Sequence, residues 1–163
     1  ELDQYLDIDA FATYLAFQDL VDNFDDIDGP GNNSYLRYDA TTGLMTVVNW
    51  DLNLAFGTQN VGGGGGGGQP GNGGAPPAGA PAQGQGQGGG PSSGNILSER
   101  FLANDAFAAL VTSATAELTA SLLDSGLAQS DLDAWVATLT EQASDLVDVA
   151  TVEKEAAAVS SYF

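Results

Sequence analysis

Hydrophobic and polar positions divide the chain into two patterned stretches with a featureless one between them. In the first stretch, apolar residues recur at helical spacing over residues 8–21 and cover more than one face, while Asp7 or Asp9 stands where a helix N-cap is favoured. The pattern predicts a helix that is buried on several sides and ends near Asp22. Residues 22–33, rich in Gly, Pro and Asn, then predict a loop.

Two strands are predicted after this loop, at residues 34–38 and 46–50. The residues between them begin with the sequence DATTG at 39–43, which is typical of a turn, so the two strands are expected to form a hairpin. Asp51 stands where the second strand gives way to a loop. Side chains at such positions often reach a ligand.

The second patterned stretch, residues 95–163, predicts helices throughout. The first two cover residues 96–101 and 107–122, and Gly126 is a plausible stop for the second. Ser130 with Asp133 resembles a capping pair that opens a third helix, and a fourth is predicted at 152–159. The stripe of the third helix is assigned to the core by its spacing: Leu132, Trp135, Leu139, Ala143 and Leu146.

Residues 62–94 separate these two stretches and hold seventeen of the 22 glycines, five of the six prolines and no charge. Such a segment cannot offset its ordering entropy by burying apolar area, so it is predicted to be a mobile, disordered loop. It lacks the lysine of a phosphate-binding glycine loop. The expected organisation is therefore a first part at 1–61, the Gly/Pro/Gln-rich loop at 62–94 and a helical part at 95–163, in an α+β fold that is mostly helical.

The composition excludes several kinds of function. With 3 basic and 22 acidic residues the net charge is −19, which disfavours binding to nucleic acid or to an anionic membrane surface and suits a secreted or high-salt protein. The chain has no cysteine and no histidine, so disulfides, thiolate or histidine metal sites and Ser-His-Asp catalysis are excluded. No apolar run approaches the roughly 18–20 residues of a membrane helix, so no membrane insertion is expected. Any secretion signal is expected to lie outside a chain that opens on Glu1.

The candidate chemistry lies in a set of oxygen donors around the first loop and the hairpin exit. Carboxylate and amide oxygens favour Mg²⁺, Mn²⁺ or Ca²⁺ over a soft metal. An EF-hand is excluded, because with Gly29 at its sixth position the first ligand would be Phe24. An irregular calcium loop and a merely solvated acidic turn stay open as alternatives. The candidate donors are Asp25, Asp26, Asp28, Asn32, Asn33, Asp51 and Asn53.

The order of these elements, helix, Asp loop, Asn, hairpin and Asp, is typical of the lower lobe of a protein kinase. The residues resemble the spore coat protein H (CotH) kinase family, a family of atypical secreted kinases, over about residues 7–57. The matches are Asn23-Phe24-Asp25 to the N-x-D block, Asn33, Tyr35-Leu36 and Asp39 to the next block, and Trp50-Asp51 with Phe56-Gly57 to the last. The helices at 95–163 are similar to those that close these proteins.

The resemblance implies that Asp25 is the catalytic-loop aspartate and that Asn33, Asp51 and Asn53 are on the metal side. Asn53 stands where the family commonly has a second acid, so an oxygen donor is kept and a charge is lost. Arg37 likewise departs from the residue common in the first strand. The activity implied is Mg²⁺- or Mn²⁺-dependent transfer of the ATP γ-phosphoryl group to Ser or Thr of a secreted or cell-surface protein.

ATP phosphates need cationic contacts, and the one lysine, Lys154, lies near the C-terminal end. The resemblance therefore implies a nucleotide-binding N-terminal lobe outside these residues, with the present chain as the C-terminal half of the kinase. The alternative is a non-catalytic structural or adhesive surface module that retains the family's fold.

Overall fold

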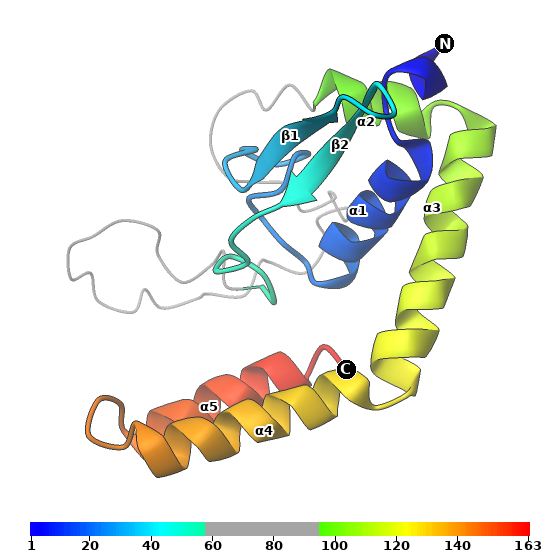
Figure 1. The fold of residues 1–163 in the computed structure, drawn as a ribbon. Coiled ribbons are helices and arrows are strands. Elements are labelled where there is room, and N and C mark those ends of the chain that lie inside the picture. The colour runs from blue at the N-terminus through cyan, green and yellow to red at the C-terminus, as the bar shows by residue number, and fades with distance from the viewer. Residues whose placement is uncertain (58–94) are drawn as a thin grey trace, which may run out of the picture.

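The structure, a computed structural model, describes residues 1–57 and 95–163. Figure 1 shows a two-stranded hairpin beside α1 (Ile8–Leu20), the long helix α3 (Asp105–Leu118) running past α1, and a pair of helices at the far end of α3. The described residues form an α+β arrangement of mostly helices and one antiparallel hairpin, as the sequence predicts. The Gly-rich loop predicted at 62–94 lies outside the described residues.

Helix α1 begins where the sequence predicts, because the side chain of Asp7 accepts a hydrogen bond from Ala10 N at 3.1 Å. It follows a short 3₁₀ turn, η1 (Leu2–Gln4), and ends at Leu20, close to the expected Asp22. Its buried residues occupy more than one face, as expected: Phe11, Ala12, Tyr14, Leu15, Ala16 and Gln18.

The hairpin consists of β1 (Ser34–Asp39) and β2 (Leu44–Asn49), with Ser34 opposite Asn49 and Asp39 opposite Leu44. Its turn is closed by Gly43 N donating to Asp39 O at 2.8 Å, and Gly43 has φ +76°, which glycine adopts without strain. The chain before α1 pairs with β2 through Met45, whose amide donates to Tyr5 O at 2.7 Å. The sheet is thereby tied to the start of α1.

The C-terminal part contains four α-helices and one π-helical segment, η3 (Thr119–Asp124), which continues α3. Asn95, Asn104 and Asp148 cap helices here by accepting from backbone amides of the first turn. The other helices are α2 (Ile96–Leu102), α4 (Leu127–Gln142) and α5 (Val149–Ser160).

The predicted start of α4 at Ser130 is wrong. The helix begins three residues earlier, after Gly126, which has φ +75° and breaks the path of η3. Ser130 N already donates to Gly126 O at 3.0 Å within the first turn, so Ser130 and Asp133 are helical residues and not a cap. The helix also ends at Gln142, which leaves Leu146 in the connection to α5.

The core forms where α1, β2 and α2 meet. Phe11 and Phe101 are fully buried and contact edge to face with ring centroids 4.9 Å apart, and Phe107 of α3 stacks on Phe101 at 4.8 Å. The buried cluster is completed by Leu6, Ala12, Tyr14, Leu15 and Val47. The first patterned stretch and α2 with α3 therefore share one core.

The assignment of the α4 stripe to the core is also wrong. Trp135 is 66% exposed and Leu146 83% exposed, and α4 has no buried residue. Figure 1 shows the reason: α4 and α5 lie side by side as a pair that projects from the end of α3, so helical spacing on α4 meets one neighbouring helix and not a core.

One stretch within the described ranges, Asp105–Asp124 across α3 and η3, is long and apolar enough to cross a membrane, with a mean hydropathy of 1.4. Core helices of soluble proteins pass the same test of length and composition. Here 6% of the apolar window is buried, and Phe107, Leu110 and Val111 pack against the core cluster. Ser and Thr residues and Glu117 interrupt this stretch, so it contains no long uninterrupted apolar run.

Replacing Phe101 by alanine should lower the free energy of unfolding by about 3–5 kcal/mol, because the change removes a fully buried ring and leaves a cavity beside Phe11 and Phe107. Urea unfolding followed by circular dichroism measures the change. Leu146→Ala is the matched control, since this exposed side chain should change stability by less than about 0.5 kcal/mol. Equal effects of the two variants would contradict this account of the core.

Candidate active site

The candidate site is built from three short segments: the loop after α1, the start of β1 and the exit of β2. Asp25 lies in the first segment and is 7% exposed. Its Oδ1 accepts from both Asn32 N at 3.1 Å and Asn32 Nδ2 at 3.0 Å. Both bonds fall on one oxygen, so the carboxylate is oriented by Asn32 through a single atom and its Oδ2 is not used by this contact.

Backbone hydrogen bonds bring this aspartate to the other two segments. Asn33 N donates to Asp25 O at 3.1 Å, and Trp50 N donates to Asn33 O at 3.2 Å. Asn33, 8% exposed, is therefore joined by its main chain both to the catalytic-loop candidate and to the residue before Asp51.

The exit of β2 returns to the loop after α1 through two further backbone bonds. Phe24 N donates to Leu54 O at 3.1 Å, and Phe56 N donates to Val21 O at 2.7 Å. The segments around Asp25 and Asp51, which the sequence expected to act together, are thus fastened to each other on both sides.

Asp51 itself is exposed and has φ +36°, and its Oδ1 accepts from Asn53 N at 3.1 Å in an Asx turn. Asp22 and Phe56 also have positive φ, at +47° and +55°. Within residues 1–57 and 95–163 these are the non-glycine residues with positive φ, and all three lie in the two segments that meet here. Such strain persists where surrounding contacts over-determine the backbone.

A chain of side-chain amides runs beneath these segments. Gln18 of α1 is 1% exposed; its Nε2 donates to Asn49 Oδ1 at 2.7 Å, and its Oε1 accepts from Asn23 Nδ2 at 2.6 Å. Asn23 Oδ1 is buried with no hydrogen-bond partner. The sequence prediction did not assign a role to Gln18, since one amide in an apolar helix carries no spacing signal.

The loop after α1 is acidic and partly buried. Asp26 Oδ1 accepts from Asp28 N at 3.0 Å and Gly29 N at 2.8 Å. Burial raises the pKa of Asp26 above its ordinary value of 3.8, and the carboxylates of Asp28 and Asp19 add to the increase, while the two backbone bonds oppose it. The one salt bridge in the described parts of the chain joins the N-terminal ammonium to Asp3, so this loop is not neutralised by an internal cation.

The side chains predicted to hold a metal ion are one carboxylate and two amides. Among the described residues no group of three or more Asp, Glu, His or Cys could hold a metal ion. The predicted set is of a different kind, because it combines the carboxylate of Asp51 with the side-chain amides of Asn33 and Asn53. The donors are all hard oxygens, which fit Mg²⁺ or Mn²⁺ in kind. Metal ligation by Asp51, Asn33 and Asn53 and the catalytic role of Asp25 stay predictions.

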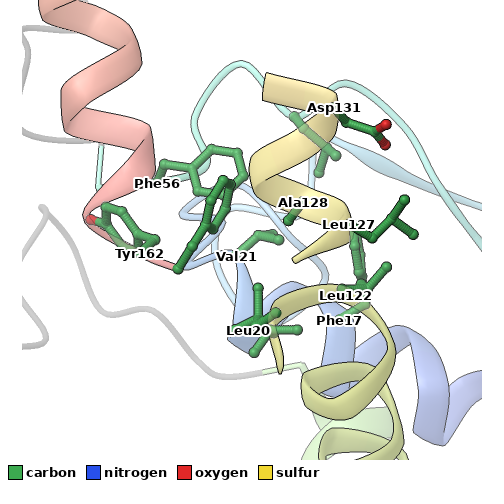
Figure 2. A pocket seen from close by; sticks show the side chains of 12 residues that line it. Phe17, Leu20, Val21, Phe56, Leu122, Leu127, Ala128, Asp131 and Tyr162 are labelled. Carbon is green, nitrogen blue, oxygen red and sulfur yellow. The ribbon is translucent and has the colours of Figure 1, made fainter. Parts of the chain in front are cut away.

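An apolar cavity of about 190 Å³ lies next to the Phe56-Gly57 pair and is shown in Figure 2. The ring of Phe56 contacts Tyr162 and Phe163 edge to face, with centroids 5.7 and 6.3 Å apart. A Cβ at Gly57, where φ is +67°, would collide with the Tyr162 hydroxyl. Tyr162 and Phe163, the last two residues, thus hold the end of the segment that follows β2. The sequence offered as a signal only an aromatic pair after an alanine-rich helix.

The comparisons with known proteins give one result. The sequence model described as CotH kinase protein matches residues 1–156. The chain belongs to the CotH kinase family. Neither the curated proteins nor the solved structures contain a significant match. The CotH match extends through α4 and into α5, well beyond residues 7–57 on which the resemblance was specific, so the C-terminal helices are part of the family's pattern as well.

Asp26→Asn should make the protein more stable at pH 7 and leave stability unchanged near about pH 3. The raised pKa of Asp26 means that the folded state binds this proton more tightly than the unfolded state. The stability from that proton is present below the unfolded pKa and is lost as pH rises through the folded pKa. Asparagine keeps an acceptor for Asp28 N and Gly29 N and carries no charge.

Urea unfolding of both proteins from about pH 3 to pH 7 measures this difference. The expected result is a gap between the two unfolding free energies that opens as pH rises. A variant that is less stable than the parent at pH 7 would show that the ionised carboxylate stabilises the loop.

Proposed function

We propose that this chain forms the catalytic and metal-binding part of a CotH-like atypical protein kinase, with a kinase-like C-terminal lobe that includes the Gly-rich loop at 62–94. The reaction is Mg²⁺- or Mn²⁺-dependent transfer of the ATP γ-phosphoryl group to Ser or Thr of a secreted or cell-surface protein. The observation that carries the proposal is the set of backbone bonds that hold Asp25, Asn33 and the segment of Asp51 together, in a chain that belongs to this family.

In this proposal Asp25 orients the acceptor hydroxyl and accepts its proton. Asn32 holds one carboxylate oxygen and thereby fixes the plane of the carboxylate, so the second oxygen is the one presented to the substrate. Phosphoryl transfer depends mostly on positioning and charge stabilisation. A carboxylate oriented from within its own loop meets the first of these needs.

Asp51, Asn33 and Asn53 would hold the divalent ion. When bound, Mg²⁺ or Mn²⁺ supplies the positive charge that offsets charge developing on the phosphates. The described acidic side chains of the loop and the strand exit have no cationic partner from the protein, which supports a role in binding a cation. The fixed Asx turn at Asp51 keeps one oxygen with Asn53 N, and the exposed position of Asp51 makes the carboxylate accessible.

The ATP phosphates would be bound largely by cations from a segment outside these 163 residues, because the chain has three basic residues: Arg37, Arg100 and Lys154. We propose that this segment is the nucleotide-binding N-terminal lobe of the complete kinase.

A second candidate is a non-catalytic structural or adhesive module of the same fold. It is favoured by exposed aromatic side chains on and next to the hairpin, where Tyr35, Tyr38 and Trp50 are each more than half exposed. Such a module would need these aromatic residues and would be indifferent to the charges of Asp25 and Asp51.

Asp25→Asn and Asp51→Asn should each lower phosphoryl transfer about a hundredfold or more. The first loses the proton acceptor, and the second loses a charged metal ligand. Both keep side-chain size and neither removes a buried apolar group. Incorporation of ³²P from [γ-³²P]ATP into a serine-rich protein, with Mg²⁺ or Mn²⁺, measures the rate in this chain and in the complete gene product that contains it.

Asp145→Asn is the matched control, because it removes the same charge from an exposed connection between α4 and α5. Labelling by the control should equal that of the unaltered protein. Labelling that survives both site variants would reject the assigned roles, and absence of labelling in the complete protein would favour the adhesive module.

A further inference from the structure

We propose that Gln18 is a positioning residue that couples the loop after α1, which carries Asp25, to the exit of β2, which carries Asp51, through three hydrogen-bonded amides, two of them buried. The inference rests on the proposed function for its chemical meaning. The coupling itself is a property of the fold and is testable without any enzymatic activity.

The hydrogen bonds between the three amides run in one direction, each amide donating to the next. Asn23 Nδ2 donates to Gln18 Oε1 at 2.6 Å, and Gln18 Nε2 donates to Asn49 Oδ1 at 2.7 Å. Asn23 precedes Asp25 by two residues, and Asn49 precedes Asp51 by two. A single side chain on α1 therefore contacts both segments that carry the candidate aspartates, each time two residues before the aspartate.

Burial makes this link stiff. Gln18 is 1% and Asn23 7% exposed, and the hydrogen bond between them is fully buried. With little water to compete, a broken bond leaves an unpaired polar atom, which is costly inside a protein. Movement of the Asn23 segment relative to α1 is therefore costly, while the bond to the exposed Asn49 is part-buried.

Packing alone does not account for the amides. Asn23 Oδ1 stays buried without a partner while its Nδ2 is held by Gln18, which destabilises the fold. Apolar side chains of similar volume would fill this space without such an unpaired atom. Apolar side chains could not form the hydrogen bonds that connect the loop after α1, through Gln18, to the exit of β2.

Glutamine is also the residue type that the link requires. Its amide oxygen accepts and its amide nitrogen donates, so it can bind a donor (Asn23 Nδ2) and an acceptor (Asn49 Oδ1) at the same time. Glutamate can accept from Asn23 but, when ionised, cannot donate to Asn49. Leucine can do neither. Leucine therefore removes both hydrogen bonds of Gln18, whereas glutamate keeps the bond from Asn23.

The first experiment is a double-mutant cycle with Asn23→Ala and Asn49→Ala, measured by urea unfolding in two backgrounds. With Gln18 present, the two changes should be non-additive by about threefold or more in the unfolding equilibrium constant. In the Gln18→Leu background they should be additive. Additivity with Gln18 present would overturn the coupling.

The second experiment asks whether the coupling positions the site, by titrating the chain with Mn²⁺ in a calorimeter. Gln18→Leu should weaken Mn²⁺ binding about tenfold, because it loses the bond to Asn49 on the side of Asp51. Phe101→Leu, a core change that destabilises the protein without touching the amides, is the control and should bind as the unaltered chain does.

The outcomes separate this inference from the proposed function. Unchanged Mn²⁺ affinity in Gln18→Leu, or an equal loss in Phe101→Leu, would overturn the positioning role. Absence of Mn²⁺ binding by the unaltered chain would overturn the metal site and with it that role. In that case the mutant cycle would still decide the coupling on its own.

Discussion

Four backbone hydrogen bonds between the loop after α1, the start of β1 and the exit of β2 are the constraint on which the candidate site depends. They join segments that bury few apolar side chains, among them Val21 and Ala55. They also make positive φ at Asp22, Asp51 and Phe56 tolerable, because neighbouring main-chain bonds fix the path on either side. Together with the side chain of Gln18, they keep the segments of Asp25 and Asp51 side by side.

These bonds in turn rest on the core. Helix α1 contributes Phe11 and Leu15 to the cluster around Phe101, and the same helix carries Gln18 to the amide chain. The same helix therefore contributes to the core and carries the side chain that we propose to position the site. The C-terminal residues act from the other side, where Tyr162 closes over Phe56 and Gly57. Disorder of α1 or of the C-terminal residues would therefore disturb the segment that follows β2.

The sequence was sufficient where the determining contacts are local. The Asp7 cap, the apolar periodicity of α1 and the turn at Gly43 each act within a few residues, and the helix and the hairpin follow from them. It failed where the contact is long-range. Gln18 meets Asn49 across 31 residues, and the α4 stripe is exposed because α4 projects from the body, a fact of topology that spacing does not encode.

The same distinction applies to the site. Asp25, Asn33 and Asp51 were assigned from their family pattern, and backbone hydrogen bonds join the segments that carry them. Electrostatics gives the remaining argument. Asp26 and Asp28 of the loop lie near Asp19 of α1, and in the described parts of the chain no ion pair offsets their repulsion, which adds to burial in raising the pKa of Asp26. These carboxylates create a negative field at the loop after α1, and a cation is the species that such a field attracts.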